Sequence, residues 1–415
     1  MTWRDQQIPL GRANTSVLPF GMGRSYGDSC LNDGNTLLAT AGLDRLIKFD
    51  ASSGRLKAEA GISFDAILQF AVPRGWFLPV TPGTRFITLG GAIANDVHGK
   101  NHHRAGTFGH HVIRFELRRS DGSRLICSPD ENPEWFRATI GGLGLTGLIV
   151  WAEVQLKPVV NSFVDTETIR YGDLDEFFAL SAESEAKYEY VVAWVDSLEK
   201  HRIGRGHFIR GNHNQETSLT ALEAPKHSKL TVPFELPVSL LNRHTLKLFN
   251  TAYYRSKPAS RTLAKVPLEP FFYPLDAIGK WNRIYGRGGL IQWQGLIPLQ
   301  HSNVAREILS LAARSGSGSF LTVMKVMGDQ PSAGLLSFSG RGITIALDFP
   351  YSQCVMDVLS RMDEIVAEIG GRLYPAKDSR MSGAHFRRFY PQWQELLPYV
   401  DSRFGSSFWR RVTAQ

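Results

Sequence analysis

The stretch from Pro82 to His103 constrains the fold of this 415-residue chain more than any other segment. Its middle, Leu89 to Ala94, consists of glycine and small or apolar residues. Glycine lets main-chain N–H groups approach a ligand that larger side chains would exclude, and successive exposed N–H groups form a concave site for an anion such as a pyrophosphate. A glycine-rich turn before a solvated loop would also account for the Gly90-Gly91 pair taken alone.

A dense run of hydrogen-bonding side chains follows directly. Burying such side chains without partners is costly, so a plain core segment would not contain them. Together with the glycines they predict a cofactor cradle that leads into an active-site wall. The run comprises Asn95, Asp96, His98, Lys100, Asn101, His102 and His103.

The composition is that of a soluble globular protein with room for two domains, since 43% of the residues are hydrophobic and 21% are charged. The net charge of +8 favours phosphate-bearing substrates or an anionic membrane surface. Nucleic acid is not indicated, because no Lys- and Arg-rich run is interleaved with aromatic residues in a known module. The 3 cysteines lack metal-ligand spacing, so neither a disulfide framework nor a metal site is expected.

The sequence also bears on location. No apolar signal segment opens it, and no uncharged apolar run reaches the ~18 residues of a spanning helix. We therefore expect a cytoplasmic protein that could contact the inner membrane peripherally. The basic amphipathic segment from Leu240 to Lys257 could rest on a membrane surface. The alternative, which we favour, is an ordinary helix packed on its own domain.

Periodicity predicts short strands interspersed with helices, and a boundary at Lys157-Pro158. Apolar residues at helical spacing indicate a helix over 62–74, and Asp121-Gly122 indicates a hairpin between strands over 112–118 and 123–127. The other expected elements are helices over 133–139, 304–314 and 355–369, and strands over 17–20, 36–40, 47–50, 56–60, 76–80, 148–156, 188–195, 202–210, 290–298, 320–326 and 342–349.

Three further segments contain candidate site residues. The turn from Gly21 to Asp28 suits a phosphate, although such glycine-containing turns are common and its spacing is not that of the Rossmann fold. Gln292 and Gln294 fall on one face of a strand because strand side chains alternate, and they could line a polar pocket or face solvent. The run from Arg372 to Arg380 gathers ionisable residues beside Tyr374, and by itself it could be a surface loop.

In this order the motifs resemble the vanillyl-alcohol-oxidase type of FAD-binding oxidoreductase, which has a PCMH-type FAD-binding domain. The ordered set is highly specific and runs nearly end to end, weakest between about residues 210 and 265. Within the family it is most similar to the branch that oxidises the ribose of polyprenyl-phosphoryl sugars. The motifs are Gly21 to Asp28, Pro82-Gly83-Thr84, Gly90 to Ala94, His98 to His103, Gly144-Leu145-Thr146-Gly147, Trp281-Asn282-Arg283 with Tyr285-Gly286, Gln292 and Gln294, Asp348-Phe349-Pro350, and Tyr374 to Arg380.

The resemblance implies an α+β fold in two parts. Residues 1–160 would form the FAD-binding domain, 161–371 a substrate domain with an antiparallel sheet and flanking helices, and 372–415 a segment that returns to the FAD domain. Substrate-side residues carry over to His98, Lys100, Trp194, Gln292, Gln294 and Lys377. FAD contacts carry over to Gly21, Gly23, Arg24, Ser25, Tyr26, Gly27, Asp28, Gly83, Thr88, Leu89, Gly90, Gly91, Asn95, Asp96, Val97, His98, Ile149 and Tyr374.

Three positions depart from the family pattern. Arg24 stands where many relatives place a flavin-linking histidine, so the resemblance implies non-covalent FAD. The cysteine that the similar branch places beside the flavin appears as Ala346. An active-site asparagine of that branch appears as Thr344, which bears on the identity of the substrate.

The implied activity is oxidation of a sugar hydroxyl by hydride transfer to flavin N5. The substrate that the resemblance implies first is a polyprenyl-phosphoryl-β-D-ribose, oxidised at its 2′-hydroxyl as the first half of epimerisation to arabinose. A separate short-chain reductase would complete the epimerisation, and a quinone or oxygen would reoxidise the flavin. Lys377 and His98 are the candidate catalytic residues, and Lys100 could bind the substrate phosphate. The alternatives are an alditol or aldonolactone oxidase, and a non-catalytic flavin-binding partner in a cell-envelope complex.

Overall fold

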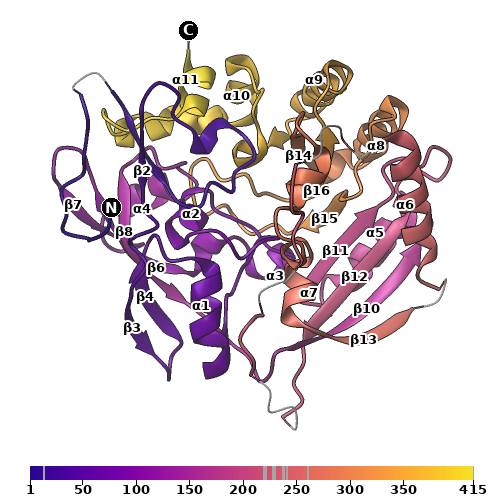
Figure 1. Cartoon of the computed structure of the whole chain (residues 1–415), viewed down its shortest axis with the longest axis horizontal. Coiled ribbons are helices and arrows are strands. Elements are labelled where there is room, and N and C mark those ends of the chain that lie inside the picture. Colours follow the sequence, from indigo (N-terminus) through magenta and orange to yellow (C-terminus); the bar gives the residue numbers. More distant parts are fainter. Residues whose placement is uncertain are drawn as a thin grey trace.

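Two antiparallel sheets of different size lie side by side in the computed structural model (Figure 1). The structure describes residues 1–12, 15–217, 222–226, 230–235, 239, 242–258 and 261–414. Helices and strands are both abundant, and the strands within each of the two sheets run antiparallel, which confirms the expected α+β class. Among the described residues, none of the helices combines the length and the apolar character needed to cross a bilayer.

The smaller sheet belongs to the N-terminal part of the chain. The expected hairpin at Asp121-Gly122 is confirmed, because its two strands pair with Arg118 opposite Arg124. The helix α1 (Phe64–Ala71) begins at Ser63, whose hydroxyl accepts a hydrogen bond from the Ala66 N–H, and its apolar side is buried. The strand order is β3 (Leu46–Asp50), β4 (Arg55–Glu59), β8 (Leu148–Gln155), β6 (Val112–Arg118) and β7 (Arg124–Cys127).

The glycine-rich stretch includes a short helix, α2 (Leu89–Ala94), which the sequence analysis did not expect. Glycine disfavours helices, so the pattern pointed to a turn. The hydroxyl of Thr88 accepts a hydrogen bond from the Gly91 N–H and begins the helix. The Gly90 N–H donates to the Ala60 carbonyl at 2.7 Å, which holds the helix close to the end of β4.

The larger sheet crosses the other half of the molecule and combines strands from distant parts of the chain. Within it, β14 and β16 pair over nine residues with Gln292 opposite Asp348 and Gln294 opposite Ala346. The strand order is β13 (Thr262–Pro267), β10 (Phe163–Tyr171), β12 (Gly206–His213), β11 (Tyr190–Val195), β15 (Val323–Met327), β16 (Gly342–Pro350), β14 (Leu290–Pro298) and β17 (Arg372–Leu373).

The two faces of the larger sheet have opposite characters, because side chains alternate along each strand. One face is apolar and forms a core with α5 (Leu174–Ser184), α8 (Val304–Ser315) and α9 (Gln353–Glu368); Trp293, Ile345 and Leu347 belong to this core. The other face turns toward the smaller sheet and lines a cavity. Its side chains include Thr168, Val192, Trp194, His207, Ile209, Gln292, Gln294, Val323, Lys325, Thr344, Ala346 and Asp348.

The C-terminal segment contacts both sheets. Its strand β17 pairs with β14, and the Tyr374 N–H then donates to the Gln294 carbonyl at 3.0 Å. Farther on, α10 (Gly383–Phe389) and α11 (Ser407–Thr413) lie above the N-terminal part in Figure 1. Arg411 forms an ion pair with Asp28 at 2.6 Å, which fixes the end of the chain to the first glycine turn.

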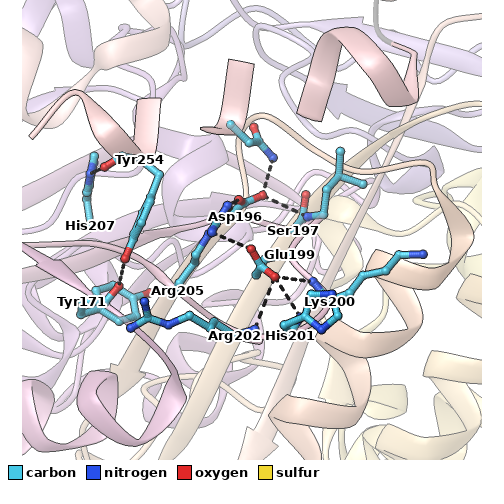
Figure 2. A network of polar contacts seen from close by, with 12 residues as sticks. Tyr171, Asp196, Ser197, Glu199, Lys200, His201, Arg202, Arg205, His207 and Tyr254 are labelled. Atoms are coloured by element: carbon cyan, nitrogen blue, oxygen red, sulfur yellow. Dashed lines mark hydrogen bonds and ion pairs between the residues drawn. The ribbon is translucent and has the colours of Figure 1, made fainter. Parts of the chain in front are cut away.

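The segment from 242 to 258 contains a helix, α6 (Arg243–Arg255), which polar contacts attach to the larger sheet (Figure 2). Asn250 donates to Asp196 at 3.0 Å, and Asp196 also binds Arg205 at 2.7 Å. Farther along α6, the Tyr254 hydroxyl donates to the Tyr171 carbonyl at 3.3 Å. The segment is therefore a helix packed on its domain, as one of the two interpretations expected; Leu240 and Leu241 lie outside the described residues.

Some expected boundaries were wrong. The strand expected over 202–210 is β12, which starts four residues later at Gly206. The reason is a turn in which the Glu199 carboxylate accepts the N–H groups of Lys200, His201 and Arg202 (Figure 2). The strand expected over 320–326 begins at Val323. The elements β10, α5 and β13 were not anticipated.

Candidate active site

A cavity of about 1280 Å³ lies between the two sheets, and residues from both sheets line it. Pockets for drug-sized ligands usually measure about 300–1,000 Å³. The volume therefore accommodates a large cofactor together with a second molecule. Its lining combines aromatic side chains, among them Trp194, Phe271 and Phe272, with polar ones such as His98 and Lys377.

Glycines form much of the wall on the side of the smaller sheet. Gly21, Gly23, Gly83, Gly90 and Gly91 all line the cavity. A side chain on Gly83 would meet nothing within 4 Å and would project into open space, so its absence leaves room for a ligand against the main chain. This wall fits a large group with a pyrophosphate, because a ligand can reach the backbone N–H groups directly.

Most of the residues that the sequence analysis assigned to the cofactor line this cavity. Four do not, namely Gly27, Asp28, Leu89 and Asp96. The residues that do are Gly21, Gly23, Arg24, Ser25, Tyr26, Gly83, Thr88, Gly90, Gly91, Asn95, Val97, His98, Ile149 and Tyr374.

The four exceptions lie behind the cavity wall and stabilise it. Asp28 forms the ion pair with Arg411, and Leu89 is buried in the core. Asp96 is buried and adopts a left-handed backbone conformation with a φ of 40°. Its carboxylate accepts hydrogen bonds from the Gly109 N–H at 2.9 Å and from the Ser337 hydroxyl at 2.5 Å. Asp96 therefore fixes the course of the chain immediately before His98.

His98 lies at the junction of the two sheets. Its Nε2 is 3.1 Å from the amide nitrogen of Gln294, which also donates to the Thr344 hydroxyl at 3.1 Å. Its Nδ1 is buried and has no hydrogen-bond partner in the described part of the chain. Burial, and then the charges of Lys325 and other neighbours, lower the pKa of His98 well below its ordinary value. His98 is therefore neutral at physiological pH, and because its Nε2 accepts from the Gln294 amide, its Nδ1 carries the proton and can donate to a ligand.

Lys377 and Asp348 face the same region from different segments. The Lys377 ammonium lies 3.8 Å from the centroid of the Tyr26 ring, and the amide of Gln292 donates to the Asp348 carboxylate. Burial lowers the pKa of Lys377, and the Asp348 charge opposes that shift. Burial raises the pKa of Asp348. The run from Arg372 to Arg380 is thus part of the cavity wall and not a surface loop.

The predicted substrate-side residues all line the cavity. Gln292 and Gln294 face it from β14, so they do not face bulk solvent. Trp194 faces it from β11, donates from its indole N–H to the Phe320 carbonyl at 2.9 Å, and packs edge-on against Tyr253 of α6 at 4.7 Å. Lys100 donates to the Phe271 carbonyl.

Sequence reasoning missed Lys325, which lines the cavity from β15. Its ammonium donates to the Gly99 carbonyl, next to His98 and Lys100. Burial is the main reason that the pKa values of Lys100 and Lys325 both fall to about 7. The signal was present in the sequence, since Lys325 is a single lysine within the apolar run from Val323 to Met327.

Comparison with known proteins identifies the class. The family model of the FAD binding domain matches residues 10–128, which include both glycine-rich segments of the cavity wall. FAD is therefore the cofactor, and the protein is a flavin-dependent oxidoreductase. The chain is 36% identical over 412 residues to decaprenylphosphoryl-beta-D-ribose oxidase of Mycolicibacterium smegmatis, covering 95% of this chain and 89% of the relative. It belongs to the family of that oxidase.

Two other relatives show how far the similarity extends. A protein of Streptomyces coelicolor, described as an uncharacterized protein in the mprA 5' region, is 32% identical over 372 residues, which cover 85% of this chain and all of the relative. A putative D-arabinono-1,4-lactone oxidase of Neurospora crassa is 28% identical over 148 residues, which cover 35% of this chain and 26% of the relative. Similarity to the lactone oxidase is therefore confined to part of the chain.

Replacing Gly27 by alanine should separate the first glycine turn from the C-terminal segment. A Cβ at Gly27 would lie 1.6 Å from the Asp378 carbonyl oxygen, next to Lys377. We expect Gly27→Ala to lower the free energy of unfolding by about 1–3 kcal/mol and to weaken FAD retention, measured by chemical denaturation and by flavin released on gel filtration. Gly288→Ala is the control, since a Cβ there meets nothing within 4 Å. Equal behaviour of the two variants would contradict the close-approach role of Gly27.

Proposed function

We propose that this protein oxidises the 2′-hydroxyl of a polyprenyl-phosphoryl-β-D-ribose to the keto form. The observation that carries the proposal is the combination of side chains that line the cavity. Polar groups suited to a sugar, ammonium groups suited to a phosphate, and apolar and aromatic side chains suited to a prenyl chain all line one cavity beside the glycine-rich wall. The end-to-end similarity to decaprenylphosphoryl-beta-D-ribose oxidase supports the same substrate class.

Bound FAD supplies the hydride acceptor for such an oxidation. The residues that would hold it non-covalently are the turn from Gly21 to Tyr26, together with Thr88, Gly91 and Tyr374. Arg24, in that turn, donates to the Phe86 carbonyl at 3.2 Å, and no histidine lies in the turn to form a covalent link.

The protein must remove the hydroxyl proton as the carbon loses its hydride. Lys377 is the first candidate, because burial lowers its pKa and favours the neutral amine that can accept a proton. His98 is the second, because it is neutral; its Nε2, which accepts from the Gln294 amide, would take up the proton after the substrate hydroxyl replaces that amide as its partner. Gln292 and Gln294 would orient the sugar by hydrogen bonds.

The rest of the proposed pathway follows from this chemistry. A quinone or oxygen would reoxidise the flavin, and a separate short-chain reductase would reduce the keto sugar with inverted configuration to give the arabinose epimer. An aldonolactone or alditol oxidase is the second candidate, which the partial similarity to the lactone oxidase favours.

Anaerobic absorbance of the FAD-loaded protein distinguishes the substrates. We expect a polyprenyl-phosphoryl ribose to bleach the flavin band, and an aldonolactone and an alditol added in parallel to leave it unchanged. Bleaching by a free sugar alone would move the substrate assignment to the second candidate. A flavin that no sugar reduces would contradict the proposed oxidation and favour a non-catalytic flavin-binding partner.

The role of Lys377 is tested by two substitutions. If its neutral amine accepts the proton, Lys377→Met and Lys377→Arg should both slow anaerobic flavin reduction by about 10²–10⁴-fold. The wild-type rate should fall as the pH decreases through the pKa of Lys377, because protonation removes the base, and that pKa lies below the ordinary lysine value of about 10.4. Retention of most activity by Lys377→Arg would instead assign Lys377 a purely electrostatic role. A wild-type rate in Lys377→Met would remove it from the mechanism.

Although α6 packs on its domain, its outward face stays exposed, and peripheral membrane contact through that face is a further part of the proposal. The helix exposes Leu248 to 73% beside the basic residues Arg243 and Lys247, a combination that suits an anionic membrane surface. We expect Leu248→Asp to reduce co-sedimentation with phosphatidylglycerol vesicles severalfold. Leu397→Asp, at another exposed leucine, serves as the control. Equal sedimentation of both variants and the wild type would exclude α6 as the contact.

A further inference from the structure

The floor of the cavity changes in character from strand to strand across the larger sheet. On β14 and β16 it is made of amides, a carboxylate and a hydroxyl. On the next strand, β15, it presents the ammonium of Lys325. Beyond β15 it presents Val192 of β11, Ile209 of β12 and Thr168 of β10, without a charged group at these positions. The polar residues on β14 and β16 are Gln292, Gln294, Thr344 and Asp348.

Lys325 and Lys100 reach this middle region from different elements. Lys325 is 7% exposed, and the part of Lys100 that is exposed lines the cavity. The main chain of Lys100 is held against β11, since the Val191 N–H donates to its carbonyl at 2.9 Å. The two side chains are close enough for the charge of Lys100 to help lower the pKa of Lys325 to about 7.

Neither lysine has an acidic partner in the part of the chain that the structure describes. The Lys325 ammonium donates to the Gly99 carbonyl, and the Lys100 ammonium donates to the carbonyls of Phe271 and Phe272. An ammonium group has three N–H donors, so Lys325 keeps two donors and Lys100 keeps one. Two neighbouring ammonium groups without a counter-ion are unfavourable in a cavity wall, and a bound anion relieves both their repulsion and their desolvation.

The neighbouring groups do not supply that anion. His98 and His102 are kept neutral because burial lowers their pKa values. The Asp348 carboxylate already accepts a hydrogen bond from Gln292 and interacts with Lys377. The two lysines are thus available to a ligand whose negative charge lies over β15.

We infer that Lys100 and Lys325 together bind the phosphodiester of the substrate, with the sugar over β14 and β16 and the prenyl chain over β11, β12 and β10. The inference rests on the proposed function and specifies the orientation in which the substrate binds in the cavity. Adjacent strands are about 4.7–4.9 Å apart. In the substrate, the phosphate is attached to C1′, the carbon next to the C2′ that is oxidised. The sugar and the phosphate are therefore close enough to lie over the neighbouring strands β16 and β15.

The test measures binding by calorimetry on the FAD-loaded protein with two ligands that cannot be oxidised at C2′. One is the 2′-deoxy analogue of farnesyl-phosphoryl ribose, and the other is its neutral methyl phosphotriester. We expect Lys325→Met and Lys100→Met each to weaken binding of the charged diester about ten- to a hundredfold and to change binding of the triester less than about twofold. Lys48→Met, on the exposed surface of β3, should match the wild type for both ligands. Lys325→Gln provides a second variant should Lys325→Met not fold.

Two outcomes would overturn the inference. One is equal affinity of the wild-type protein for the charged and the neutral ligand. The other is an equal loss of affinity for both ligands in the Lys325 variants, which would show that Lys325 only supports the structure of the cavity wall. A failure of the proposed oxidation would be seen in the separate absorbance experiment, in which polyprenyl-phosphoryl ribose would not bleach the flavin band. The two ligands of the binding experiment are not oxidised, so the preference for the charged ligand can be measured whether or not the flavin is bleached there.

Discussion

The pairing of β14 with β16 is the interaction on which the rest of the site depends. Its register sets Gln292 opposite Asp348 and places Gln294 where it reaches both His98 and Thr344. The same strand accepts β17 on its other edge, so it also positions Tyr374 and, three residues later, Lys377. A slip of β14 by one residue would turn Gln292 and Gln294 into the apolar core behind the sheet, because strand side chains alternate. The hydrophobic face that packs on α8 and α9 therefore specifies the polar face that lines the cavity.

Desolvation sets the chemistry of this cavity. Lysines and histidines that are removed from water lose charge more readily, and their pKa values fall; buried carboxyl groups show the opposite shift. The site thus combines a neutral histidine, a lysine biased toward its free amine and a pair of lysines with no acidic partner among the described residues. Such a set is poorly suited to a neutral, freely soluble sugar and well suited to a substrate that brings its own negative charge. The opposite wall, built on glycine, leaves the backbone free for the cofactor.

Much of the fold could be read from local patterns. The strand over 290–298 and the helix over 133–139 have the expected bounds, because each has a regular apolar period and clear turn or proline signals at its ends. The strand β12 was misplaced because the carboxylate of Glu199 extends the preceding turn, an interaction that periodicity does not reveal. The helix α2 was missed because packing against β4 and a threonine cap outweigh the poor helix propensity of glycine. Lys325 was missed because a single lysine in an apolar strand indicates a buried charge but does not show what that charge binds.

The sequence by itself determined the class of the protein and most of the cavity wall. Its ordered glycine and histidine motifs are specific, since close approach of a backbone to a ligand requires glycine at particular places. Only the tertiary structure decided which of those residues face the cavity. Gly27, Asp28, Leu89 and Asp96 belong to the motifs yet support the wall from behind, through a close backbone contact, an ion pair, core packing and hydrogen bonds. The meeting of Lys100 with Lys325, 225 positions apart in the chain, likewise depends on strand order and register, which no local sequence pattern encodes.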